Sequence, residues 1–263
     1  MGRNPSFDGA RPLWASQNFL TSSRLIRRLL ALTSLGSQDE VLEIGPGKGH
    51  ITGQLLALCR CVTAVELDPA LYDRLQTQFA DARNLRLIHG DFLLWPLPAH
   101  GDYKVFSNLP FGATTDIVRR LAEAGNPPTE AWLVMERGAA MRFCGKPRES
   151  LRSVLLKNRF YVRIVYRLQR EDFHPMPSVD AVLLHLRQKP APDVPQERWA
   201  HYQRFLTTGF NGGLKGLRRS FPAAAVDRAL AAAGVPLCRA PGDILYIQWL
   251  CLYRCCCQNV RCP

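Results

Sequence analysis

The sequence lacks any long apolar run, and no segment approaches the ~18 residues that a membrane-spanning helix needs. The opening stretch, MGRNPSFDGARPLW, also lacks the apolar region of a signal peptide. These two absences argue against a membrane-embedded or secreted protein. We therefore expect a cytoplasmic protein with no membrane partner.

Paired cysteine spacing is missing as well. The chain has nine cysteines, an odd number, and no pair of C-x-x-C units. Paired C-x-x-C units are typical of zinc sites, and an even number of cysteines is typical of a disulfide framework. We expect free thiols in a reducing compartment and no metal site.

Acidic residues are scarce relative to basic ones. The 263-residue chain carries 34 Lys and Arg against 22 Asp and Glu, a formal net charge of +12. Such an excess favours a polyanionic partner, either nucleic acid or an acidic membrane surface. It says nothing about the fold.

The stretch at positions 41–52, VLEIGPGKGHIT, organises the rest of the chain. An apolar run typical of a buried strand leads into Gly45, Gly47 and Gly49, and helical spacing follows. This unit lets the backbone approach a nucleotide-like ligand closely. Glu66, 21 residues after Gly45, closes the next predicted strand and suits the ribose hydroxyls.

Two better-known glycine-rich patterns are absent from this turn. A phosphate-binding loop needs Ser or Thr after its lysine, but Gly49 follows Lys48. The dinucleotide pattern needs glycine at the position that His50 occupies. The turn alone therefore leaves the ligand open, and a purely structural turn remains an alternative.

Two further predicted strands end in polar residues. Asp91 follows the strand at 85–89, and Asn108 follows the strand at 103–106. Successive strands that end in this way are typical of a ligand site along the carboxyl edge of a parallel sheet. We predict an α/β fold with a Rossmann-like sheet.

The tetrapeptide Asn108-Leu109-Pro110-Phe111 makes a resemblance specific. With SQNFL ahead of the glycine turn and FHPMPSVD near position 175, it resembles the rRNA adenine N6-methyltransferases. Within that family the chain looks most like the Erm group, which methylates large-subunit (23S) rRNA and confers macrolide–lincosamide–streptogramin B resistance. The resemblance extends from about residue 15 to 186.

The resemblance implies S-adenosylmethionine as cofactor and assigns roles to individual residues. Glu66 would accept the ribose hydroxyls, and Asp91 would accept the adenine amine. The implied cofactor-binding residues are Asn18, Leu20, Gly45, Gly47, Glu66, Leu67, Asp91, Phe92 and Asn108. The implied catalytic residues are Asn108, Leu109, Pro110, Phe111 and Phe173, with the two phenylalanines stacking on either face of a flipped adenine.

Basic residues dominate the stretch from 142 to 170, where Glu149 is the only acid. A solvated face is the alternative, but the lack of compensating acids favours RNA contact. A second basic segment, NGGLKGLRRS at 211–220, is predicted to be a flexible turn suited to phosphates. The predicted RNA-binding residues are Arg142, Lys146, Arg148, Arg152, Lys157, Arg159, Lys215, Arg218 and Arg219.

The chain divides into two predicted domains. Residues 1–187 form the methyltransferase domain, preceded by a mobile tail at about 1–14, and QKPAPDVP at 188–195 is a linker. Residues 196–263 form a small all-helical RNA-binding domain, with helices at about 197–208, 222–233 and 243–253. We expect a monomer that acts on 23S rRNA before full ribosome assembly.

Three other functions remain open at this stage. The housekeeping small-subunit (16S) rRNA adenine dimethylases share most motifs, although Lys48, His50 and the FHP loop favour the resistance group. A catalytically inactive RNA-binding relative is disfavoured by the intact Glu66, Asp91 and Asn108. A dinucleotide oxidoreductase is disfavoured by NLPF and by the basic charge.

Overall fold

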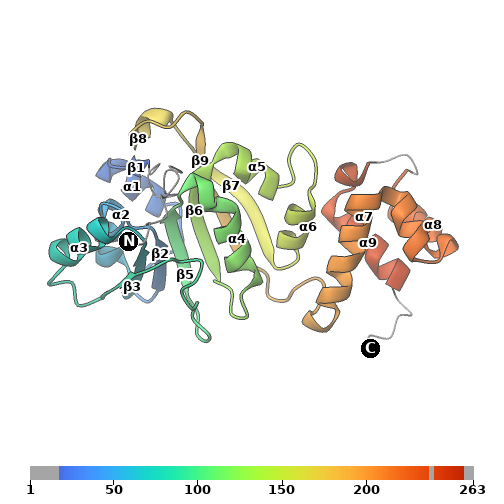
Figure 1. The fold of residues 1–263 in the computed structure, drawn as a ribbon, viewed down its shortest axis with the longest axis horizontal. Coiled ribbons are helices and arrows are strands. Elements are labelled where there is room, and N and C mark those ends of the chain that lie inside the picture. The colour runs from blue at the N-terminus through green and yellow to red at the C-terminus, as the bar shows by residue number, and fades with distance from the viewer. Residues whose placement is uncertain (1–17, 237–239, 258–263) are drawn as a thin grey trace, which may run out of the picture.

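The computed structural model describes residues 18–236 and 240–257. A sheet flanked by helices occupies one end of the molecule, and three C-terminal helices gather at the other (Figure 1). The predicted tail at 1–14, and Ser16 and Gln17 of the SQNFL motif, lie outside the described residues.

The central sheet has seven strands in the order β4-β3-β2-β5-β6-β9-β7. Adjacent strands from β4 through β6 are parallel, and β9 pairs antiparallel with both β6 and β7. The predicted Rossmann-like sheet is confirmed. The strands are β2 Glu40–Ile44, β3 Cys61–Glu66, β4 Leu85–His89, β5 Lys104–Asn108, β6 Glu130–Glu136, β7 Phe160–Leu168 and β9 Ala181–Gln188.

Both faces of the sheet are covered, which explains why its inner strands read as continuous apolar runs. In β6, Leu133 joins the core on one face, while Trp132 and Val134 join the core on the other. Side chains of a strand alternate between faces, so one apolar strand serves both cores. The helices of this part are α1 Ser23–Leu30, α2 His50–Leu58, α3 Pro69–Gln78, α4 Thr114–Glu123, α5 Arg137–Phe143 and α6 Leu151–Lys157.

A separate two-stranded sheet joins distant parts of the chain. Strand β1, Phe19–Leu20, pairs antiparallel with β8, Phe173–His174, so that Leu20 lies opposite Phe173. Both of these side chains are buried in the same apolar cluster as Ile26 of α1. Phe19 and Leu20 of the SQNFL motif therefore meet the FHP motif through backbone pairing (Figure 1).

The C-terminal helices are α7 Trp199–Ser220, α8 Ala223–Ala232 and α9 Tyr246–Cys257. The prediction of a flexible turn at 211–220 is wrong, because this segment continues α7 beyond a kink at Gly213, where φ is 60°. Leu214 and Leu217 are both buried there. Their three-residue spacing places both side chains on one helix face, and burial of that face favours helix over turn. Lys215, Arg218 and Arg219 thus lie on a helix.

Within residues 18–236 and 240–257, no helix has both the length and the apolarity required to cross a membrane. The seven described cysteines are free thiols. The same part of the chain holds no cluster of three or more His, Cys, Asp or Glu side chains that could bind a metal ion.

The glycine turn generates a stability prediction at Gly49, where φ is +79° and an added Cβ would lie 2.7 Å from the Phe79 ring. Gly49→Ala should therefore lower the free energy of unfolding by about 1–3 kcal/mol, because strain and a clash add together. Urea unfolding monitored by circular dichroism measures this change. Gly125→Ala is the control, since a Cβ there meets nothing within 4 Å. Equal losses in both variants would contradict the prediction.

Candidate functional site

The candidate site lies at the carboxyl edge of the sheet, where β2, β3, β4 and β5 end. These four strands are parallel and adjacent, so the residues that follow them meet at one edge. The Gly45 turn follows β2, Glu66 closes β3, and Asn108 closes β5. The structure thus brings these three predicted positions together.

The glycine turn has a left-handed backbone at each of its glycines. The φ angles are 66° at Gly45, 59° at Gly47 and 79° at Gly49, a region that side-chain-bearing residues rarely adopt. A Cβ on Gly45 would meet no protein atom within 4 Å, because this position faces the open edge. The backbone there is accessible to a ligand.

Glu66 is a buried acid with an accessible fraction of 1%. Its Oε2 accepts the Gly47 N–H at 2.9 Å, and its Oε1 accepts the Asp68 N–H at 2.9 Å. Burial raises the pKa of Glu66, and backbone hydrogen bonds from Asp68, Gly47 and Leu67 oppose that rise. Each carboxylate oxygen keeps a second lone pair, so the group can still accept hydroxyl donors.

An apolar cavity of about 90 Å³ adjoins Glu66. Leu67 and Phe92 contribute apolar surface to it, and Asp91 supplies a carboxylate. The Arg120 guanidinium lies over the Phe92 ring, 5.9 Å from its centroid, and so supports that ring from outside the cavity lining. The cavity suits a flat ring that has donors at its edge.

Asn108 carries the most informative polar atom of the site. Its Nδ2 donates to the Asn18 carbonyl at 2.7 Å, whereas its Oδ1 is buried and has no partner among the described residues. An unpaired buried acceptor costs about 1–3 kcal/mol. Asn108 borders a small cavity with Gly45, Pro110 and Phe111. A ligand N–H donor in that cavity would satisfy the free oxygen.

The predicted stacking of a base between Phe111 and Phe173 is not preformed. The ring centroids are 6.5 Å apart and the ring planes meet at 74°, an edge-to-face contact. Phe173 is only 4% exposed. A base held between two faces needs parallel rings, so Phe111, which is half-buried and borders the cavity, is the ring that can offer a face.

Three of the predicted site residues contribute mainly through their backbone and not through their side chains: Asn18, Leu20 and Leu109. Leu20 is buried in the core and borders neither cavity. The Leu109 side chain is buried and its N–H donates to the Val134 carbonyl, which leaves its own carbonyl as the predicted acceptor. The Asn18 carbonyl positions Asn108.

Lys48 fixes the short strand that supplies Asn18. Its Nζ lies 4.9 Å from the centroid of the Phe19 ring, so the glycine turn contacts β1 directly. Together with the β1–β8 pairing, this contact covers the site at the strand ends.

The sequence patterns did not single out Glu43 as a notable residue. It is buried within β2, and Thr52 donates to its Oε2 at 2.7 Å. Burial raises the pKa of Glu43 to about 8, and the nearby charge of Glu66 adds to the rise. The available signal was a lone acid inside the apolar run VLEI.

Four of the predicted RNA-binding residues have partners within the protein. Lys157 pairs with the buried Glu149 at 2.5 Å, and Arg159 donates to the Ala122 and Ala124 carbonyls. Arg148 pairs with Asp243 at 3.0 Å, and Arg218 pairs with Asp227 at 2.6 Å. The predicted residues that stay exposed without an ion pair in the described chain are Arg142, Lys146, Arg152, Lys215 and Arg219.

A mixed seven-stranded sheet with a glycine turn after β2, an acid after β3 and NLPF after β5 defines the class of Rossmann-like methyltransferases. The family model described as ribosomal RNA adenine dimethylase matches residues 14–235. The chain belongs to this family, and the predicted resemblance is confirmed.

Individual relatives support the same assignment. An rRNA adenine N-6-methyltransferase of Lysinibacillus sphaericus is 33% identical over 196 residues, covering 74% of this chain and 79% of that one. A ribosomal RNA small subunit methyltransferase A of Chlorobium luteolum is 34% identical over 201 residues, covering 74% and 72%. The crystal structure of the 23S rRNA methyltransferase ErmE superposes with a TM-score of 0.82 at 28% identity, covering 91% of this chain and 99% of that one.

The buried Glu43 carboxyl predicts a pH dependence of stability. Its pKa rises from an ordinary 4.5 to about 8 on folding, so the folded chain keeps a proton that the unfolded chain loses between these values. The stability due to the neutral carboxyl is full below about pH 4.5 and is lost as the pH rises through about 8. Glutamine is neutral throughout. The stability of Glu43→Gln relative to wild type should therefore increase between pH 5 and 8, by roughly a few kcal/mol.

Urea unfolding of both proteins at pH 5, 6.5 and 8 measures this difference. The exposed Glu171→Gln is the control and should track the wild type at each pH. Parallel stability profiles for Glu43→Gln and wild type would contradict the raised pKa.

Proposed function

We propose that this protein transfers a methyl group from S-adenosylmethionine to the exocyclic N6 amine of an adenine in 23S rRNA. The observation that carries the proposal is the buried, unpaired Oδ1 of Asn108, an acceptor at the end of β5 that matches an amine donor. Methylation in the peptidyl-transferase region would confer resistance to macrolides, lincosamides and streptogramin B. The protein acts as a monomer on rRNA that is not yet fully assembled into ribosomes.

The residues at the strand ends fit the cofactor. The free lone pairs of Glu66 suit two ribose hydroxyls, and Asp91 suits the adenine amine beside the apolar surface of Leu67 and Phe92. The open backbone at Gly45 leaves room for the methionine part. When bound, S-adenosylmethionine supplies an electrophilic methyl group on a sulfonium cation.

Asn108 and Leu109 prepare the target amine for attack. The adenine amine is a poor nucleophile because its lone pair is delocalised into the ring. Acceptance of its two N–H groups by Asn108 Oδ1 and the Leu109 carbonyl localises that pair on nitrogen. No proton must leave before the methyl group is transferred, so no general base is assigned. The rate enhancement then comes from positioning and fixed dipoles.

Phe111 holds the flipped base in this arrangement. Its half-buried ring borders the same cavity as Asn108, and Pro110 fixes the chain between them. Stacking on one aromatic ring contributes roughly 1–3 kcal/mol per base. Phe173 supports Phe111 from the side through their edge-to-face contact.

Small-subunit rRNA is the second candidate substrate. The Chlorobium luteolum small-subunit methyltransferase is as similar in sequence as the Lysinibacillus sphaericus enzyme, at 34% and 33% identity. The superposition with ErmE over 91% of this chain favours the large subunit.

Removal of the Asn108 side chain tests the mechanism. Asn108→Ala deletes one preorganised acceptor, and methyl transfer should fall by roughly two orders of magnitude or more. Cofactor affinity, measured by calorimetry, should change far less, because the Glu66 cavity is intact. Asn126→Ala is the control, since that amide only bonds the carbonyls of Pro98 and Gly101. Wild-type turnover of Asn108→Ala would refute the role of Asn108.

The substrate is tested by methyl transfer from labelled cofactor to purified 23S and 16S rRNA, followed by mapping of the label. We expect one adenine in the peptidyl-transferase region of 23S rRNA to be modified. Expression in a sensitive bacterium should raise resistance to all three drug classes together, and Asn108→Ala should abolish it. Label on 16S rRNA with unchanged drug sensitivity would establish the small-subunit alternative.

A further inference from the structure

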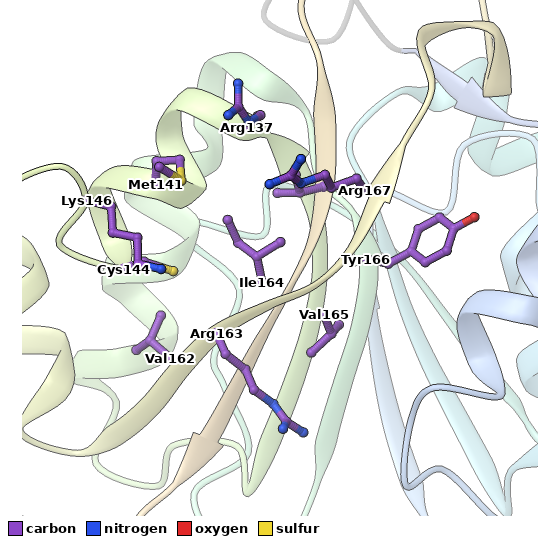
Figure 2. A pocket seen from close by; sticks show the side chains of 11 residues that line it. Arg137, Met141, Cys144, Lys146, Val162, Arg163, Ile164, Val165, Tyr166 and Arg167 are labelled. Atoms are coloured by element: carbon purple, nitrogen blue, oxygen red, sulfur yellow. The ribbon is translucent and has the colours of Figure 1, made fainter.

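A groove separates helix α5 from the edge strand β7, outside the site already described. It encloses about 600 Å³ (Figure 2). Met141 and Ile164 give it apolar walls, and the half-buried thiol of Cys144 lies between them. Strand β7 ends the sheet, so this groove is open to solvent along one side.

A β-bulge determines which side chains enter the groove. The β7–β9 register shifts between Ile164 and Tyr166, so that Ile164 lies opposite Leu184 and Tyr166 lies opposite Leu183. One extra residue in a strand reverses the face of every side chain beyond it. Arg167 therefore lies opposite Val182, whose side chain faces the α5 side of the sheet.

Without the bulge, Tyr166 would occupy the groove and Arg167 would face α1. With it, Tyr166 lies on the α1 face, where the Arg28 guanidinium is 5.1 Å from its ring centroid. Figure 2 shows Arg167 directed toward α5 and Tyr166 directed away. Bulges that re-aim a side chain are common beside active sites.

The charges around the groove have one sign. Arg137, Lys146 and Arg167 are exposed on its rim, and no acidic residue is among those that form it. None of the three cations has an ion-pair partner within the described part of the chain. Arg163 also borders the groove, but it differs from them because its side chain points to the opposite face of the sheet, where its Nε donates to the buried His185 Nδ1 at 3.3 Å.

Two hydrogen bonds connect the groove to the FHPMPSVD loop, which leads to the proposed methyl-transfer site. The Arg137 N–H at the start of α5 donates to the Asp180 carbonyl at 2.8 Å, which ends the FHPMPSVD loop. The Arg170 guanidinium, just beyond β7, donates to the Pro177 carbonyl of the same loop at 2.9 Å. Phe173 begins this loop, so the upper end of the groove adjoins the segment that supports the target base.

We propose that this groove binds the sugar–phosphate backbone of the RNA strand on one side of the flipped adenine, with Arg137, Lys146 and Arg167 at phosphates. The proposal rests on the function proposed above and adds a subsite to it. Three cations without ion-pair partners, in a groove with no acidic residue in its lining, match a polyanion, and the apolar walls can contact sugars and base edges. A peptide strand added to the edge of β7 would not need three cations, and it is the competing outcome.

The salt dependence of RNA binding tests the groove. The probe is a fragment of 23S rRNA that spans the peptidyl-transferase region, titrated with the full-length protein. The triple variant Arg137→Ala, Lys146→Ala, Arg167→Ala should flatten the slope of log affinity against log salt by about two units, because three phosphate contacts are lost. Calorimetric cofactor affinity should stay unchanged.

Arg163→Ala is the matched control on the same strand. It removes the same charge four residues from Arg167 but from the opposite face, so its salt slope should equal that of the wild type. An unchanged slope in the triple variant, or an equal change in Arg163→Ala, overturns the groove assignment. Failure of the wild type to methylate 23S rRNA would instead overturn the proposed function.

Cys144 provides a spatial test in the unmodified protein. Bound RNA fragment should slow alkylation of Cys144 by iodoacetamide at least several-fold, measured peptide by peptide by mass spectrometry. Cys61, at the start of β3, lies four strands away from β9 toward the other end of the sheet and should react at the same rate with and without RNA. Equal protection of both thiols, or of neither, would overturn the assignment, as would protection of Cys144 by an added peptide strand alone.

Discussion

The hydrogen bond from Asn108 Nδ2 to the Asn18 carbonyl determines which atom of the site is left for a substrate. An amide side chain can rotate to present either its donor or its acceptor, and this bond fixes the acceptor side toward the cavity. Its partner belongs to a segment that is held by the pairing with β8, the Lys48–Phe19 contact and the burial of Leu20. Local geometry at the end of β5 therefore depends on three segments that are far apart in the sequence.

Two acids, Glu43 in β2 and Glu66 at the end of β3, are buried close to the candidate site. Glu43 and Glu66 lie near one another, and burial raises the pKa of both. Their hydrogen-bond partners differ. The backbone N–H groups of Gly47 and Asp68 donate to Glu66, whereas the Thr52 hydroxyl donates to Glu43. This difference favours charge on Glu66 and a proton on Glu43, so only one of these two neighbouring acids is charged. Electrostatic repulsion within the pair is thereby reduced.

The sequence allowed the strand ends to be located, because a parallel sheet leaves few places for a glycine turn, an acid and an asparagine that each follow an apolar run. Properties that depend on tertiary partners were not accessible in this way. The spacing of the basic residues does not reveal that Lys157 forms an ion pair with Glu149. It also does not reveal that Arg159 donates hydrogen bonds to two carbonyls at the end of a helix. The bulge at Val165 has no signature in the alternation of β7, and the segment at 211–220 became helical because Leu214 and Leu217 have a core to enter. The edge-to-face packing of Phe111 and Phe173 likewise follows from burial rather than from either motif.

Besides the cores on the two faces of the sheet, a further apolar cluster joins α6 to the C-terminal helices α7, α8 and α9. Val154 of α6 is fully buried among Tyr202, Phe205 and Trp249, and Asn158 bonds both backbone groups of Val194 just ahead of α7. The segment at 188–195 thus separates two parts of the chain without separating their cores. A fragment cut there would expose an apolar face of α6 to water, and the remaining sheet would lose solubility along with its helical neighbour. The two parts have therefore to be expressed and engineered as one piece.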